Sequence, residues 1–221
     1  MLRLKVIVGS TREGRAAERV IPWLTSTATA HGSFDVELLD LRDWSLPMFS
    51  ETVTTVGNPQ DPVFSDPVVR EWNRKIGEGD AFVFLTPEYN HSVPAVLKNA
   101  IDSVFTTFSF RNKPFSSVGY SGGIAGASRA IEHLAQIGIE SEMVPLRNSV
   151  LIPYVNDAFD SNGALKSPQC ELAATILFDD LAWWAAHLKQ AREEGSLPPA
   201  FLRITAANRE GEEGAVHNRS T

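Results

Sequence analysis

The loop at residues 86–94 combines the residue types that suit a flat ring with polar edges. It follows an apolar run at residues 81–85 and offers a carboxylate, a phenol and an amide after a proline, at Pro87, Glu88, Tyr89 and Asn90. In an open parallel sheet, ligands bind in loops at the carboxyl ends of the strands. The alternative, left open by these residues alone, is an ordinary turn in which Ser92 and Pro94 only begin the next helix.

A second polar loop follows the first predicted strand and opens a helix. It contains Gly9, Ser10, Thr11, Arg12 and, three residues on, Arg15. Free amides at a helix N-terminus attract phosphate, and two hydroxyls with a guanidinium complete such a site. The pattern is neither a Gly-x-Gly-x-x-Gly dinucleotide fingerprint nor a Walker loop. A solvated turn with two surface arginines remains the alternative.

These loops require an alternation of strands and helices to position them. Apolar runs predict strands at residues 4–8, 34–39, 81–85, 115–120 and 149–152, and spacing of three and four predicts helices near residues 17–28, 66–76, 97–105, 127–137 and 168–192. Right-handed crossovers wind such a chain into an α/β fold with a parallel sheet between two helical layers. We expect residues 1–193 to form one domain and residues 194–221, which lack apolar periodicity, to form a mobile tail.

Composition excludes several classes of function. The chain has 221 residues and a net charge of −7, which disfavours nucleic acid and anionic membranes as partners. No apolar run approaches the roughly 18 residues of a membrane span. The one cysteine, Cys170, allows no internal disulfide, and with no apparent signal peptide we expect a cytoplasmic protein. Five scattered histidines suggest no metal site.

Three separated segments together resemble one family, the NADPH-dependent FMN reductases, which include flavodoxin-like quinone, azo and chromate reductases. The similar segments are Gly9 to Arg12, Pro87 to Asn90 with the Leu97-Lys98-Asn99-Ala100 run and Asp102, and Tyr120 to Gly123 with Gly126. The resemblance covers roughly residues 3 to 190. It implies a five-stranded sheet of order 2-1-3-4-5.

The resemblance also implies where the FMN cofactor lies. Ser10, Arg12 and Arg15 would hold its phosphate, Pro87, Glu88, Tyr89 and Asn90 would bind the edge of the isoalloxazine, and Ser121, Gly122 and Gly123 would border the ring. Glycines allow the backbone to approach a flat ring closely. The chain departs from many members of the family at Arg15 and Ala17.

We therefore expect an enzyme that takes hydride from NADPH or NADH and passes electrons through FMN to a small-molecule acceptor. Quinones, azo compounds, metal oxyanions and free flavin are the candidate acceptors, and one open ring face predicts ping-pong turnover. No protein acid or base is required, since the flavin carries the chemistry. The family also implies a homodimer or homotetramer. The alternative function is a non-enzymatic electron carrier of the flavodoxin type.

Overall fold

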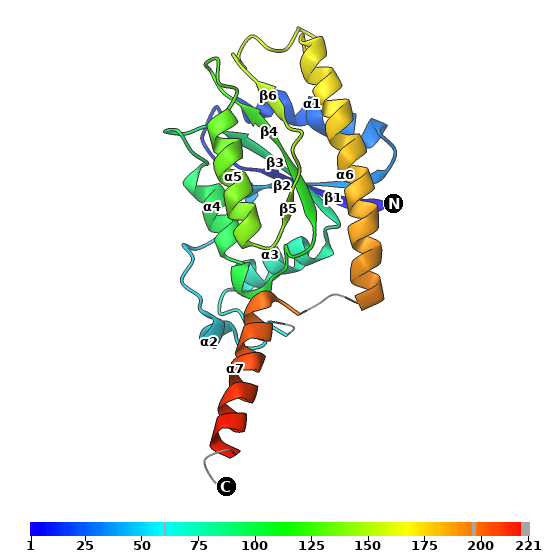
Figure 1. Ribbon diagram of the computed structural model, residues 1–221. Helices are drawn as coiled ribbons and strands as arrows, with labels where there is room; N and C mark the ends of the chain where they lie inside the picture. Colours follow the sequence, from blue (N-terminus) through cyan, green and yellow to red (C-terminus); the bar gives the residue numbers. More distant parts are fainter. Residues whose placement is uncertain (60, 196–197, 218–221) are drawn as a thin grey trace. The chain divides into compact units, whose positions relative to one another are not determined.

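A computed structural model describes residues 1–59, 61–195 and 198–217. It divides into two compact units, Met1–Lys189 and Gln190–Thr221. The first unit holds a parallel sheet (Figure 1). Its strands are β1 (Leu2–Val8), β2 (Phe34–Asp40), β3 (Ala81–Pro87), β4 (Pro114–Tyr120), β5 (Val144–Pro145) and β6 (Val150–Ile152).

The strands lie in the order β2-β1-β3-β4-β5, and β6 also pairs with β4. The predicted flavodoxin-like α/β fold and its strand order are thus confirmed. The sequence predicts one strand beyond β4, whereas the structure has two short ones. Val144 of β5 pairs with Pro114, and Val150 of β6 pairs with Val118, so each forms its own ladder with β4. The sheet therefore has six strands, with β5 and β6 sharing one neighbour.

Helices cover both faces of this sheet. One core cluster joins α1 (Ala17–Ala30) and α6 (Pro168–Gly195) to the sheet, and the other joins α3 (Pro67–Glu78), α4 (Ala95–Asp102) and α5 (Ser128–Glu140) to the opposite face. Successive residues of a strand point to opposite faces. Accordingly Val83 and Leu85 lie in the first cluster, whereas Phe82 and Phe84 lie in the second.

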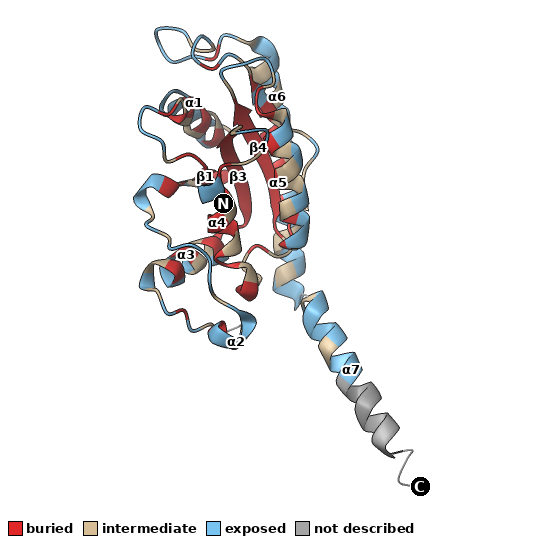
Figure 2. Cartoon of the chain, turned by 90° about the vertical axis from the view of Figure 1, so that its left-hand side faces the viewer, coloured by how far each residue is buried: buried red, intermediate tan, exposed pale blue. Residues whose placement is uncertain are grey.

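All seven residues of β3, and all seven of β4, are buried (Figure 2). Strands buried along their whole length are typical of parallel sheets covered on both sides. The segment from Asp40 to Pro67, whose structure the sequence left open, contains the 3-10 turn Leu41–Asp43 and the short helix α2 (Val53–Val56). A second 3-10 turn, Phe105–Thr107, follows α4.

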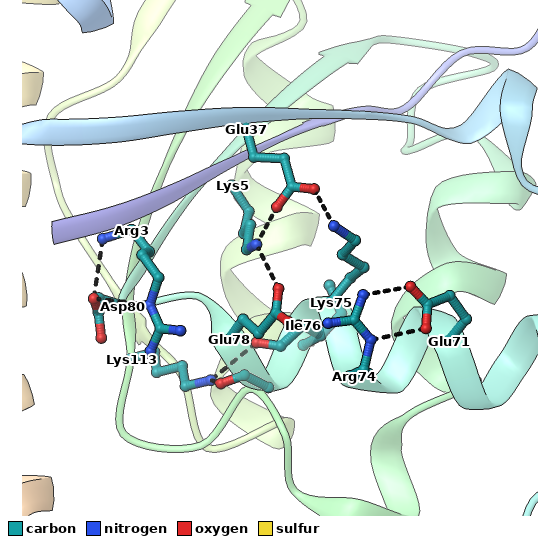
Figure 3. A network of polar contacts seen from close by, with 11 residues as sticks. Arg3, Lys5, Glu37, Glu71, Arg74, Lys75, Ile76, Glu78, Asp80 and Lys113 are labelled. Atoms are coloured by element: carbon teal, nitrogen blue, oxygen red, sulfur yellow. Dashed lines mark hydrogen bonds and ion pairs between the residues drawn. The ribbon is translucent and has the colours of Figure 1, made fainter.

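A buried lysine on an interior strand of the sheet reaches α3. The Lys5 side chain on β1 is 3% exposed, and its ammonium contacts Glu37 of β2 and Glu78 of α3 (Figure 3). Lys75 contacts the same Glu37 from α3. These charges are compensated by each other, as buried charges must be.

The second unit contains α7 (Ala200–His217). This helix lies in the segment that the sequence assigns to a tail after residue 193. The sequence makes no prediction of a helix there, and the mobility of this segment stays a prediction.

Candidate functional site

Three polar loops meet where β1, β3 and β4 end, because these strands are neighbours in the sheet. The amide of Gly9 donates to the carbonyl of Leu85 at 2.8 Å, which joins the first loop to the end of β3. The hydroxyls of Ser10 and Tyr89 lie 2.6 Å apart. The structure thus brings together the first two predicted parts of the site, which are 79 residues apart in sequence.

The first loop has the character of an anion site. Within the described ranges, the backbone N–H groups of Thr11, Arg12, Glu13 and Gly14 donate no hydrogen bond to another protein group. Gly14 adopts a φ of +62°, which turns the chain into α1. Arg12 is exposed, and its guanidinium lies 5.4 Å from the centre of the Tyr89 ring. Free amides and a cation at a helix N-terminus fit a phosphate group.

Arg15 faces the other way. Its side chain is 2% exposed, and it donates to both carboxylate oxygens of Asp40, to Glu18 and to the Ser10 carbonyl. The hydrogen bonds that Arg15 donates to Asp40 raise the Arg15 pKa despite burial. Burial alone would raise the Asp40 pKa, but the bonds from Arg15 and the Arg42 amide lower it. The Arg15 guanidinium is thus bound by the protein itself, and its contact with the FMN phosphate stays a prediction.

Tyr120, which the sequence placed in a matching segment but not among the cofactor-binding residues, is a buried neighbour of this loop. Its residue is 3% exposed, and its hydroxyl has no hydrogen-bond partner in the described part of the chain. Burial raises the pKa of the Tyr120 phenol, so it stays protonated. Ser10 lies close enough to lower this pKa, but burial has the larger effect. The signal was a phenol at the last position of a predicted strand.

The second loop is a tight two-residue turn. Tyr89 and Ser92 exchange both backbone hydrogen bonds, at 2.9 and 3.1 Å, and the two residues between them have positive φ, 49° for Asn90 and 74° for His91. Two central residues of positive φ define a type I′ turn. This geometry exposes the Asn90 and His91 side chains at the tip, while Pro87 is buried as the last residue of β3.

Helix α5 holds this turn through two side-chain contacts. The Glu88 side chain is 6% exposed and pairs with Arg129, while its second oxygen, Oε2, has no partner among the described residues. The Ser92 hydroxyl lies 2.9 Å from Nδ1 of His133. Arg129 and His133 are one helical turn apart, so they reach the same loop. Neither was among the residues that the sequence singled out.

The third loop is open where the ring is expected. A Cβ added to Gly122 or Gly123 would meet no atom within 4 Å, and both residues are exposed. Ser121 turns inward, donating to the Gly123 carbonyl at 2.9 Å and accepting from the Gly126 amide at 3.0 Å. The fold therefore does not demand glycine at positions 122 and 123, which leaves room for a flat ligand.

Together the loops fit FMN. The anion site, the polar turn and the open glycine loop provide, in order along one edge of the sheet, groups for a phosphate and a planar ring. In the described ranges there is no cluster of side chains suited to a metal, and no described helix is both long and apolar enough to cross a membrane.

Comparison with known proteins agrees with this geometry. A sequence model described as NADPH-dependent FMN reductase matches residues 2–157. An NAD(P)H-dependent FMN reductase of Pseudomonas aeruginosa is 33% identical over 157 residues, covering 70% of this chain and 80% of its own. A 2-hydroxy-1,4-benzoquinone reductase from a Burkholderia species is 28% identical over 187 residues, covering 83% of this chain and 96% of its own.

Among solved structures, the flavoenzyme FerB of Paracoccus denitrificans, an NAD(P)H:(acceptor) oxidoreductase, superposes with a TM-score of 0.70. It is 23% identical and covers 85% of this chain and 98% of its own, so it supports the fold. The chain therefore belongs to the NADPH-dependent FMN reductase family and is an oxidoreductase with FMN as cofactor and NAD(P)H as electron donor.

Proposed function

We propose that this protein passes electrons from NADPH or NADH through FMN to a quinone, an azo compound, a metal oxyanion or free flavin. The observation that carries the proposal is the meeting of an anion loop and an open glycine loop at one sheet edge. The similar benzoquinone reductase favours quinones as the first acceptors to test. FMN supplies the redox chemistry, and the chain binds and orients it.

The proposed roles of the residues follow from their positions. Arg12 and the free amides beside Ser10 bind the phosphate, and the turn from Pro87 through Glu88, Tyr89 and Asn90 contacts one edge of the ring. Glu88 contributes its backbone, because its side chain is buried against Arg129.

On the other side of the ring, Gly122 and Gly123 border it at close approach, with Ser121 holding their loop. The two loops leave one face of the ring open for a planar guest. The donor must then leave before an acceptor can occupy the same face, so turnover is ping-pong.

Kinetics test this order. Initial rates against NADPH at several fixed quinone concentrations are expected to give parallel double-reciprocal lines, and anaerobic NADPH alone should bleach the flavin absorbance stoichiometrically. Intersecting lines would show that both substrates bind together. Absence of NADPH oxidation with every small acceptor would instead favour the flavodoxin-type carrier.

We also propose a homodimer or homotetramer, as expected for the family. Exposed apolar side chains gather beside the site: Met48 is 76% exposed, Phe49 and Val96 each 39%. A cavity of about 300 Å³ lies among Trp44, Met48 and Val96. Burying this surface in a subunit contact would remove it from water.

Light scattering of the wild type at micromolar concentration is expected to give at least twice the chain mass. Met48→Asp combined with Val96→Asp should shift the mass toward the monomer. Leu172→Asp on α6, a position 61% exposed, serves as the control and should leave the mass unchanged. A monomeric wild type with full activity would contradict the proposal.

The single cysteine is consistent with a reducing compartment, and the cytoplasm remains the proposed location.

A further inference from the structure

Three hydroxyls lie in a row beneath the phosphate loop. Ser10, which is fully buried, has its hydroxyl 2.6 Å from that of Tyr89. Ser10 also lies close enough to Tyr120 to lower its pKa, while the Tyr120 hydroxyl has no well-formed hydrogen bond among the described residues. A buried hydroxyl without a partner costs about 1–3 kcal/mol in proteins. Among the described residues, Tyr120 therefore carries a poorly satisfied donor close to Ser10 of the anion site.

The protons of this row can be counted. Each hydroxyl has one proton and can accept one or two hydrogen bonds. If Tyr120 donates to Ser10 and Ser10 donates to Tyr89, the row makes two hydrogen bonds, and the proton of Tyr89 remains for an acceptor outside the row. Tyr89 is only partly buried, and the Arg12 guanidinium lies over its ring. The cation favours an anionic acceptor at the outer end of the row.

We propose that Tyr120 is a positioning residue of the phosphate site, whose buried hydroxyl donates to Ser10 when a phosphate monoester draws the protons of Ser10 and Tyr89 outward. Its unsatisfied donor is then paired in the complex and unpaired in the free protein. The difference adds to the affinity for phosphate. This inference rests on the proposed binding of FMN through its phosphate by the loop that contains Ser10 and Arg12.

Tyr120→Phe tests the inference, because it removes the hydroxyl and keeps the ring. The unfolding free energy without ligand should be unchanged or higher, since an unpaired donor is lost. The dissociation constant for FMN should rise about tenfold, and that for riboflavin, which has no phosphate, should change less than twofold. Inorganic phosphate should raise the melting temperature of the wild type more than that of the variant.

Thr106→Val is the matched control. Thr106 also has a buried hydroxyl without a partner in the described residues, but it lies after α4, on the segment that leads to the start of β4. Its removal should change neither dissociation constant. A double-mutant cycle provides a second measurement, with Tyr89→Phe, Tyr120→Phe and the variant that carries both. The loss of FMN affinity in the double variant should be smaller than the sum of the two single losses, since both hydroxyls act through Ser10.

The outcomes separate the two proposals. A wild type that binds neither FMN nor riboflavin overturns the proposed function. Unchanged FMN affinity in a folded Tyr120→Phe variant overturns the role of Tyr120 and leaves the proposed function standing. An equal loss for FMN and riboflavin also overturns that role, because it would reflect a general change in the site.

Discussion

Two arginines of one short loop have opposite environments. Arg12 is exposed above Tyr89, whereas Arg15 is buried against Asp40. A guanidinium already bound to a carboxylate has little charge to offer a second anion, so a phosphate has one fully available cation in this loop. Two arginines that look alike in sequence thus differ in what they contact, and of the two only the exposed Arg12 is free of a carboxylate partner among the residues that the structure describes.

Arg12→Ala is expected to weaken FMN binding by about 1.5–3 kcal/mol, the value of a charge-assisted hydrogen bond, with little change in stability. Arg15→Ala should instead lower the free energy of unfolding by about 3 kcal/mol, because it leaves Asp40 largely buried without its partner. FMN titration of the apoprotein and urea unfolding measure the two effects. An Arg15→Ala variant with unchanged stability and no FMN binding would show that Arg15 contacts the phosphate.

The glycines of the third loop give a second prediction. Gly122→Ala and Gly123→Ala should leave stability nearly unchanged, because the added Cβ meets no protein atom, but should weaken FMN binding if the ring lies there. Gly126→Ala is the contrasting variant: its φ is +57°, and a Cβ would lie 3.0 Å from Cβ of Leu151. We expect it to lose about 1 kcal/mol or more of stability. Unaltered FMN affinity in both open-loop variants would move the ring elsewhere.

At the scale of elements, the two-residue turn after β3 is strained, and contacts with another element hold it in place. Asn tolerates positive φ better than most residues, but His91 at φ 74° is a less favourable second residue for a type I′ turn than glycine. The contacts of Glu88 with Arg129 and of Ser92 with His133 hold the turn on α5. Helix α5 thus supports a loop that follows another strand.

His91→Gly should raise the free energy of unfolding by about 0.5–1 kcal/mol, because glycine adopts positive φ without steric cost. Asn90→Gly, the control at the neighbouring position, should gain less. Chemical denaturation of the apoproteins measures both. A loss of stability in His91→Gly would show that the imidazole, whose ring centre lies 6.3 Å from that of His133, makes contacts that outweigh the strain.

At the scale of the whole first unit, ion pairs join segments that are distant in sequence. Glu37 binds Lys5 and Lys75, Asp40 binds Arg15, and Asp80 accepts from the Arg3 amide and from Lys189 of α6. Burial would raise the pKa of each carboxyl, but these hydrogen bonds and charges lower it below the ordinary value. All three groups are more acidic in the folded protein.

Stability should therefore fall in acid. A carboxyl whose folded pKa is lowered stabilises the protein fully above its unfolded pKa, about 4.5 for Glu37 and 3.8 for Asp40 and Asp80, and this stabilisation is lost as pH falls through the folded value. Urea unfolding should show little change in stability from these groups between pH 7 and 5, where their stabilisation is complete, and a decline below about pH 4.5. Glu37→Gln should reduce that slope, and an unchanged slope in this variant would show that Glu37 does not contribute to it.

The sequence by itself determined the alternation of strands and helices, the parallel sheet and the two polar loops after β1 and β3. These features depend on local patterns: apolar runs predict buried strands, and polar residues directly after them predict the ligand edge. The sequence did not predict strand β5, because its two residues are too few to show a periodic pattern. Likewise, α7 lies where the sequence shows no apolar repeat.

Only the tertiary structure decided which polar groups are paired with other groups of the protein. Arg15 and Asp40 are 25 residues apart, and Glu88 and Arg129 are 41 apart, so no local pattern relates them. The neighbourhood of Ser10 and Tyr120 likewise exists because β1 and β4 flank β3. Side-chain chemistry could be read from the chain, but burial and pairing, which decide whether a charge or hydroxyl faces the ligand, arise when distant segments pack together.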